Sequence, residues 1–384
     1  MSVDSESSQK TSLAALFTPY ALNGLMLPNR LVMAPMTRGF ATAGVPSENA
    51  VSYYARRAGM GLILTEGVAP DLIGSPETTV PNMFGAEALS VWARIVSAVH
   101  ASGGRIMAQL WHTGLRRKVA KSFDPSQPSL GPSDYYPELD PARRNEPNRA
   151  VSGRAMSQQD IDATIRSYAS AAKAARDLGF DGVELHGAHG YMLDQFFWAE
   201  CNRRNDRYGG SLGNRVRLAT EIISEIKRVA GRDFPVGLRF SQWKLPDFYD
   251  ARMFESPKEL EEFLTPFVDV GTDFFHASTR RYWDAAFPSS PLTLAGWTRR
   301  ITATTTIAVG SVGLSGPMAA TAIGTEVATQ DNVAPLCRLV EEGEFDLVAV
   351  GRAVLADAQW AEKVRNGNFS TINQYTAAAL GQLT

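Results

Sequence analysis

Two histidines and a tyrosine stand close together in the sequence, at the end of an apolar stretch. Val183 and Leu185 alternate with other residues as in a short β-strand, and His186, His189 and Tyr191 follow with glycines between them. Two imidazoles and a phenol among glycines at the end of a strand look like residues that carry chemistry. The stretch is a candidate catalytic site. A structural hydrogen-bonding role for the histidines, and simple packing for the tyrosine, fit the pattern as well.

A metal site is a less favoured alternative for His186 and His189. A spacing of three residues suits two ligands on a helix, but a strand end flanked by glycines is a different setting, and no third ligand is evident nearby. The chain has only two cysteines, Cys201 and Cys337. These are too few for a disulfide framework or for an iron–sulfur cluster.

The composition describes a globular chain that acts on small molecules. It has 384 residues, of which 44% are hydrophobic and 20% charged, and a formal net charge of -2. There is no basic excess for nucleic acid and no apolar run long enough for a membrane span. Residues 1–12 lack the apolar core of a signal peptide, so we expect a disordered tail and a cytoplasmic protein. We expect residues 13–384 to form a single domain, because α/β barrels exceed the usual domain size.

Strand and helix patterns alternate along the chain and must position these residues. Strands are expected at residues 31–35, 61–65, 105–110, 181–185, 235–240, 273–277, 306–309 and 345–350. Helices are expected at residues 47–58, 86–101, 157–178, 214–229, 256–270 and 329–342. Eight alternating units predict an α/β fold, a (β/α)8 TIM barrel. No Gly-x-Gly-x-x-Gly follows the first strand, which disfavours a doubly wound dinucleotide fold.

Three further segments extend the predicted barrel. Residues 23–30 predict an N-terminal β-hairpin, and long loops are inserted after strand three, at residues 116–153, and after strand six, at residues 278–294. Both loops leave the C-terminal ends of strands, where the active sites of such barrels lie. They are candidate lids over the active site. The alternative is that they are surface loops with no role in the reaction.

Several motifs occur in an order that resembles the old yellow enzyme family of FMN-dependent ene-reductases. They are the run from Asn29 to Thr37, Gln109-Leu110-Trp111, the run from His186 to Tyr191, Asn202 with Arg204, the run from Asp206 to Gly210 with Asn214-Arg215, and Val350-Gly351-Arg352. The resemblance covers roughly residues 16–366. One departure is Gly213, where the family usually has Glu before Asn-Arg.

The resemblance implies a function and its cofactors. FMN is expected to be bound tightly and non-covalently, and NAD(P)H to reduce it. Reduced FMN would then reduce the activated C=C bond of enones or nitroalkenes in a ping-pong cycle. His186 and His189 would donate hydrogen bonds to the oxygen of the activating group, and Tyr191 would protonate the α-carbon. Trp111 and Trp283 are the other expected substrate contacts.

The resemblance also implies the contacts of the flavin. Its ring is expected to meet Pro35, Met36, Thr37, Gly67, Gln109 and Arg239. Glycine at 67 would permit close approach of the backbone, and the Arg239 guanidinium would stabilise the anionic reduced flavin. The loops after strands seven and eight of such barrels commonly bind phosphate through backbone N–H groups. The phosphate site is accordingly expected at Gly310, Ser311, Gly313, Gly351 and Arg352.

Two other function classes are weighed against this one. The first is a flavin-free barrel lyase or isomerase acting on a phosphorylated substrate, and the second is a flavin-binding module without turnover. The visible absorption of bound flavin separates the first from a flavoenzyme. The sequence leaves open the physiological substrate, the stereoselectivity, a monomer or a homodimer, and the choice between NADH and NADPH. Four loop arginines could meet a 2′-phosphate or be solvated: Arg143, Arg144, Arg280 and Arg281.

Overall fold

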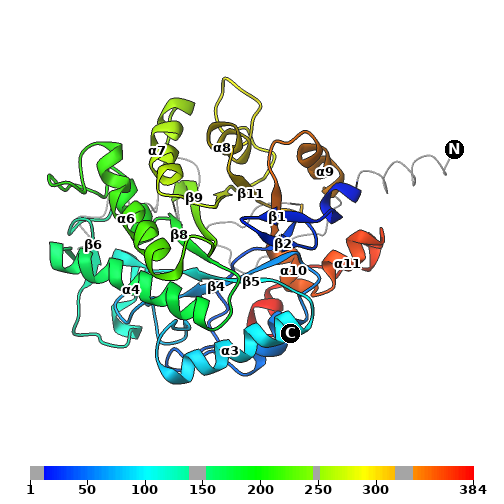
Figure 1. The fold of residues 1–384 in the computed structure, drawn as a ribbon, viewed down its shortest axis with the longest axis horizontal. Helices are drawn as coiled ribbons and strands as arrows, with labels where there is room; N and C mark the ends of the chain where they lie inside the picture. Colours follow the sequence, from blue (N-terminus) through cyan, green and yellow to red (C-terminus); the bar gives the residue numbers. More distant parts are fainter. Residues whose placement is uncertain (1–12, 138–152, 245–250, 316–331) are drawn as a thin grey trace.

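A closed barrel of eight parallel strands lies at the centre of the computed structural model, which describes residues 13–137, 153–244, 251–315 and 332–384 (Figure 1). Around the barrel the strands are β3 (Leu31–Met33), β4 (Leu62–Val68), β5 (Ile106–Leu110), β8 (Val183–His189), β9 (Val236–Lys244), β10 (Phe274–Ser278), β11 (Thr305–Val309) and β12 (Leu347–Val350). All eight predicted strands are present. The predicted (β/α)8 barrel is therefore confirmed.

Helices surround the barrel (Figure 1). They are α2 (Asn49–Ala55), α3 (Ala86–Ala101), α4 (Gln158–Asp177), α5 (Met192–Phe197), α6 (Leu212–Ala230), α7 (Pro257–Asp269), α8 (Leu294–Thr302), α9 (Val333–Glu341), α10 (Arg352–Ala356) and α11 (Trp360–Arg365). Side chains cap several starts: Ser157 forms a capping box with Asp160, and Ser211 accepts a hydrogen bond from the backbone of Asn214. The sequence did not predict α5, α8, α10 or α11, each of which has at most nine residues. None of the described helices is long and apolar enough to cross a membrane.

The N-terminal hairpin closes one end of the barrel. Strands β1 (Tyr20–Leu22) and β2 (Leu25–Leu27) pair antiparallel, three residues earlier than predicted. Asn23 and Gly24 form the turn, both with positive φ. Leu22 and Leu27 are buried in a cluster that includes interior barrel residues such as Leu62. Because the hairpin lies against the starts of the strands, the site must form at their C-terminal ends.

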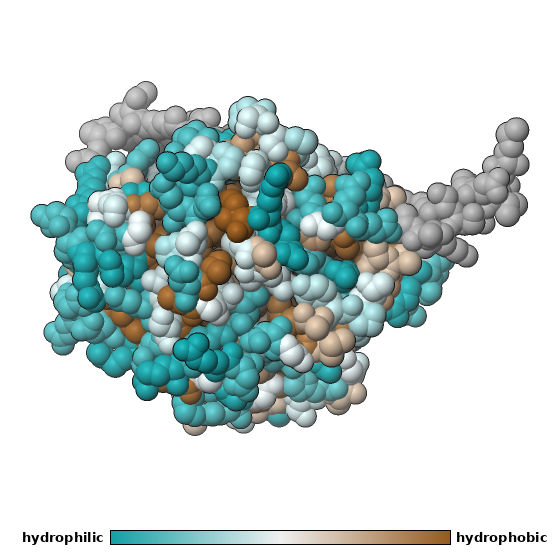
Figure 2. All heavy atoms as spheres, turned by 45° about the horizontal axis from the view of Figure 1, so that its top comes forward, coloured by the Kyte–Doolittle hydropathy of each residue, from teal (hydrophilic) through white to brown (hydrophobic). Residues whose placement is uncertain are grey.

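The two inserted loops contain little regular structure. After β5, the strands β6 (Ser129–Gly131) and β7 (Gly153–Ala155) form a small parallel pair, and residues 138–152 between them lie outside the described residues. After β10, a single antiparallel bridge joins Ala285 to Thr293. The face shown in Figure 2 is largely hydrophilic, with hydrophobic residues in small separate groups.

Candidate active site

His186, His189 and Tyr191 lie together at the C-terminal end of β8. The ring centroids of the two histidines are 5.0 Å apart, and those of His186 and Tyr191 are 5.2 Å apart. His189 and Gly190 both have positive φ, at 64° and 77°. These two left-handed residues turn the chain so that Tyr191 lies beside the strand end that carries His186. The structure thus brings together the three residues expected to do the chemistry.

Buried polar side chains from β9 and α5 form hydrogen bonds with the backbone of this turn. The backbone N–H of His189 donates to Ser241 Oγ at 3.1 Å, and that of Gly190 donates to Asp194 Oδ2 at 2.6 Å. The other oxygen of Asp194 accepts from Lys244 Nζ at 2.6 Å, and both side chains are fully buried. Burial raises the pKa of Asp194 and lowers that of Lys244, and their mutual attraction opposes both shifts.

Aromatic side chains line the space in front of the turn. The Trp111 ring packs edge-on to Tyr191 with centroids 4.9 Å apart, and Trp243 stacks on His189 with centroids 4.2 Å apart. A Cβ at residue 67 would lie 2.3 Å from Trp111 Cε3. The absence of a side chain at Gly67 leaves space for the Trp111 indole. The sequence predicted a glycine here for a different reason, the close approach of the backbone to a flavin ring.

Both histidines are neutral at neutral pH. Burial, reinforced by the positive charge of Arg239, holds the pKa of His186 and that of His189 well below the ordinary value of 6.5. A neutral imidazole keeps one N–H donor and one acceptor nitrogen. The pair can therefore offer two N–H groups to one oxygen without carrying a charge itself.

A hydrogen-bonded layer crosses the barrel interior below these histidines. Gln109 Nε2 donates to Glu184 Oε1 at 2.7 Å, and the other Glu184 oxygen lies 2.7 Å from His276 Nδ1. The strand register places His186, Arg239 and His276 side by side on β8, β9 and β10. Glu184 thus fixes the orientation of the Gln109 amide.

Four buried polar atoms in this region have no hydrogen-bond partner within the described part of the chain: Trp111 Nε1, His186 Nδ1, Arg239 Nε and His276 Nε2. Buried polar atoms in folded proteins normally have partners. Together with the buried guanidinium of Arg239, they fit a polar ligand that carries negative charge at the barrel mouth.

The predicted phosphate site lies at the ends of β11 and β12. Gly310, Ser311 and Gly313 all have positive φ. A Cβ at Gly351 would lie 3.6 Å from Met36 Sδ, so this loop adjoins the end of β3. The Gly313 N–H, however, donates to Asn332 Oδ1 at 2.7 Å. That amide is already bonded, and the expected contact of Gly313 with phosphate is not open to it in this structure.

The remaining predicted contacts are Pro35, Met36, Thr37 and Trp283. Pro35 and Met36 are half-buried, and Thr37 is exposed beyond the end of β3. Trp283 is 41% exposed and packs edge-on to Tyr282. No ring contact joins Trp283 to the two histidines or to Tyr191, all of which are described. Arg143 and Arg144 lie outside the described residues.

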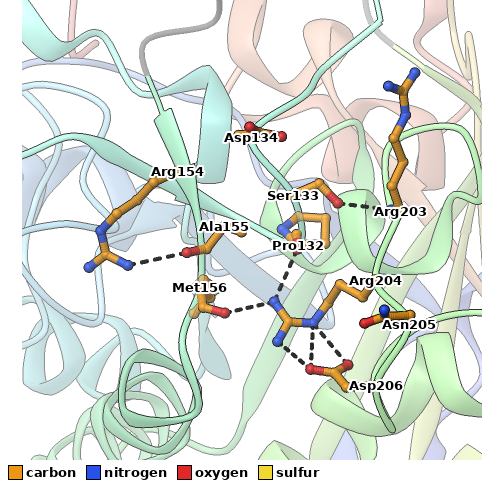
Figure 3. A pocket seen from close by; sticks show the side chains of 10 residues that line it. All are labelled: Pro132, Ser133, Asp134, Arg154, Ala155, Met156, Arg203, Arg204, Asn205 and Asp206. Carbon is orange, nitrogen blue, oxygen red and sulfur yellow. Dashed lines mark hydrogen bonds and ion pairs between the residues drawn. The ribbon is translucent and has the colours of Figure 1, made fainter.

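The motif residues after α5 have structural roles. Asn202 Nδ2 donates to the carbonyls of Phe196 and Tyr208, both at 2.8 Å. Arg204 pairs with Asp206 and binds the carbonyl of Met156 at 2.7 Å (Figure 3). Arg204, Asp206 and Met156 are among the residues that line a cavity of about 470 Å³. The cavity lies between the loop after β5 and the segment that joins α5 to α6, and two of its arginines, Arg154 and Arg204, are already paired with Asp160 and Asp206.

Comparison with known proteins identifies the family. A family model described as "NADH:flavin oxidoreductase / NADH oxidase family" matches residues 15–370. The chain belongs to this family. The predicted membership of the old yellow enzymes is thereby confirmed, and with it FMN as the cofactor and a nicotinamide as the reductant. The unpartnered buried atoms around Arg239 and Gln109 fit the flavin ring.

Relatives and solved structures agree with this assignment. The chain is 38% identical over 248 residues to flavin oxidoreductase hxnT of Emericella nidulans, covering 62% of each chain. It is 37% identical over 231 residues to 12-oxophytodienoate reductase 2 of Arabidopsis thaliana, covering 59% of this chain and 60% of the relative. These matches span about three fifths of each relative. A structure of morphinone reductase in complex with tetrahydroNAD superposes with a TM-score of 0.78 at 26% identity, over 95% of this chain and 93% of that one.

Sequence reasoning missed several residues that shape the site. Trp243 and Ser278 contact His189, and Asp194 with Lys244 holds the turn beside it. Ser278 and Lys244 are the last residues of β10 and β9. A systematic search of strand C-terminal ends would have found them, since the barrel gathers those ends at one face.

Proposed function

We propose that this protein is an ene-reductase, which uses FMN and NAD(P)H to reduce the activated C=C bond of α,β-unsaturated carbonyl or nitro compounds. The observation that carries the proposal is the clustering of two neutral imidazoles and a phenol beside the buried Arg239. The names of the relatives, which are reductases and oxidoreductases, support the same class.

The side chains divide the reaction between them. FMN, when bound, would supply the hydride chemistry that links the nicotinamide to the substrate. His186 and His189 bind the carbonyl or nitro oxygen and stabilise the negative charge that develops there. Tyr191, 5.2 Å from His186 between ring centroids, donates the proton to the α-carbon.

The groups below the pocket serve the cofactor. Arg239 would hold the flavin ring, and its positive charge would stabilise the anionic reduced form and so favour reduction. Gln109, held by Glu184, would bind the polar edge of the flavin ring. Trp111 and Trp243 border the space in which nicotinamide and substrate would bind in turn, as a ping-pong cycle requires.

A two-step experiment tests this function. The purified protein is expected to show the visible absorption of bound flavin, to lose it on anaerobic addition of NADH or NADPH, and to regain it on addition of enones or nitroalkenes. A colourless protein that binds no FMN would favour the flavin-free lyase or isomerase. Reduction by the nicotinamide without reoxidation by any activated alkene would contradict ene-reduction.

A further inference from the structure

The ring of His189 is held by contacts that His186 lacks. His189 Nε2 lies 2.8 Å from Ser278 Oγ, and the ring stacks on Trp243 at an interplanar angle of 17°. His186 has a buried Nδ1 with no hydrogen-bond partner in the described part of the chain. The two imidazoles therefore face one space but differ in how their nitrogens are fixed.

Ser278 decides which nitrogen of His189 carries the proton. The Ser278 hydroxyl is buried at the end of β10, and Arg239 Nη2 approaches its oxygen to 3.4 Å. A guanidinium can only donate hydrogen bonds, so the Ser278 oxygen accepts from Arg239 and its own hydrogen needs an acceptor. Within the described residues the hydroxyl has one other hydrogen-bond partner, His189 Nε2. His189 Nε2 is then the acceptor, and the proton of the neutral ring is on Nδ1.

We propose that Ser278 is a positioning residue that holds His189 as the Nδ1–H tautomer, and so aims that N–H at the oxygen of the substrate. The inference deepens the proposed ene-reduction and rests on it for the identity of that oxygen. It also joins two parts of the site, because one hydroxyl links Arg239 on the flavin side to His189 on the substrate side.

The neighbouring strand offers a matched control. Ser241 is paired in register with Ser278, on β9, and is equally buried. Its hydroxyl accepts from the backbone N–H of His189 and donates to the Trp243 carbonyl at 2.7 Å, so it does not bond the His189 ring. Ser241→Ala removes a buried hydroxyl beside the same residue and leaves the partner of the ring nitrogen in place.

The first test reads the tautomer itself. The FMN-loaded protein is labelled with [15N]histidine, and the two-bond correlations of each ring distinguish its N–H nitrogen from its unprotonated one. His189→Asn assigns the His189 signals among the five histidines. We expect Nδ1–H for His189 in the parent and in Ser241→Ala, loss of that single tautomer in Ser278→Ala, and its return in Ser278→Thr. An Nε2–H tautomer in the parent, or an unchanged Nδ1–H in Ser278→Ala, would overturn the proposal.

The second test reads the binding of an oxygen ligand. 4-Chlorophenol is titrated into the oxidised, FMN-loaded proteins and its dissociation constant is taken from the change in flavin absorption. We expect Ser278→Ala to weaken it about 2- to 10-fold, the ordinary net worth of a hydrogen bond, and Ser278→Thr to recover most of the loss. Equal affinity in Ser278→Ala and the parent would overturn the role of Ser278 in aiming the donor. If enones fail to reoxidise the parent while the tautomer shift is seen, the proposed function fails and the effect of Ser278 on His189 stands.

Discussion

The two ends of the proposed flavin site are built in different ways. At the end of β8, a contiguous run of side chains from His186 to Tyr191 is held by buried side chains from β9, β10 and α5. At the ends of β11 and β12, the predicted phosphate contacts are mainly backbone groups of residues in left-handed conformations, with Arg352 the one charged side chain among them.

The difference follows from what each end must do. A reaction needs donors aimed at one oxygen and one carbon, so small errors in side-chain direction are costly. A phosphate can be held by backbone N–H groups, whose direction is set by the fold of the loop. Removing an oxygen donor or the buried ion pair at the substrate end should therefore cost more than removing one contact at the phosphate end.

The largest effect is expected from breaking the ion pair behind the substrate end. Lys244→Met leaves the buried carboxylate of Asp194 without its partner, and should cost about 3–5 kcal/mol of the free energy of unfolding. Urea unfolding measures the loss. Arg154→Ala, which removes a partly exposed ion pair with Asp160, should cost less than about 1 kcal/mol. Equal costs for the two variants would mean that the Lys244 pair does not stabilise the turn.

Removing the oxygen donors should disable turnover and spare the flavin. His186→Ala and His189→Ala are each expected to slow enone reduction by about 10²–10³-fold, the usual cost of one lost donor. Stopped-flow reoxidation of the reduced enzyme by an enone gives the rate, and FMN content measured beside it is expected to stay normal. Loss of flavin from either variant would place that histidine in cofactor binding.

How much of this could be predicted from the sequence also differs between the two ends. The eight strands and the cluster of His186, His189 and Tyr191 were predicted, since apolar runs and one contiguous motif specify them. The Ser278 and Lys244 contacts were not predicted. They depend on the register between strands far apart in the chain, which only the closed barrel sets. The hydrogen bond from Gly313 to Asn332 joins residues 19 positions apart, and no local pattern signals it.

Tyr191→Phe separates proton transfer from hydride transfer within the substrate end. It removes only the hydroxyl, so packing against Trp111 should change little. We expect near-normal reduction of FMN by the nicotinamide and an enone half-reaction slowed on the order of 10²-fold. The half-reaction with nitroalkenes should be slowed less, because the nitronate formed by hydride transfer is stable enough to be protonated by water. Stopped-flow traces of both half-reactions decide the matter: equal slowing of the two, or of neither, would exclude Tyr191 as the proton donor.

At the phosphate end, Arg352→Ala tests whether a charge adds to the backbone contacts. Losing one charge-assisted hydrogen bond should weaken FMN binding about 10- to 100-fold, measured by quenching of flavin fluorescence on reconstitution. Arg300→Ala, on the outer helix α8 beside Trp297, is the control and should leave the affinity unchanged. An unaltered dissociation constant in Arg352→Ala would show that the charge of Arg352 does not contribute to FMN binding.

The smallest predicted effect is a change in the free energy of unfolding with each unit of pH, caused by Glu66. Glu66 is on β4, which lies between β12 and β8 around the barrel. Its carboxylate accepts the backbone N–H groups of Arg38 and Gly39, directly after Thr37, at 2.9 and 3.1 Å. Burial raises the pKa of Glu66 from 4.5 to about 7. The folded state thus binds this proton more tightly than the unfolded state does. The stability that the protonated group contributes is fully present below about pH 4.5 and is lost as the pH rises through about 7.

Glu66→Gln keeps an oxygen for the two N–H groups and removes the titration. The difference in unfolding free energy between variant and parent should therefore move in favour of the variant, by about 1 kcal/mol per pH unit between pH 5 and 7. Four histidines with lowered pKa values give the opposite trend, but they are common to both proteins and cancel in the difference. Urea unfolding of the flavin-free proteins at pH 5, 6, 7 and 8 measures it. If the unfolding free energies of the two proteins change in parallel with pH, Glu66 stays charged in the folded state. The loop after β3 would then be anchored on a carboxylate at every pH tested.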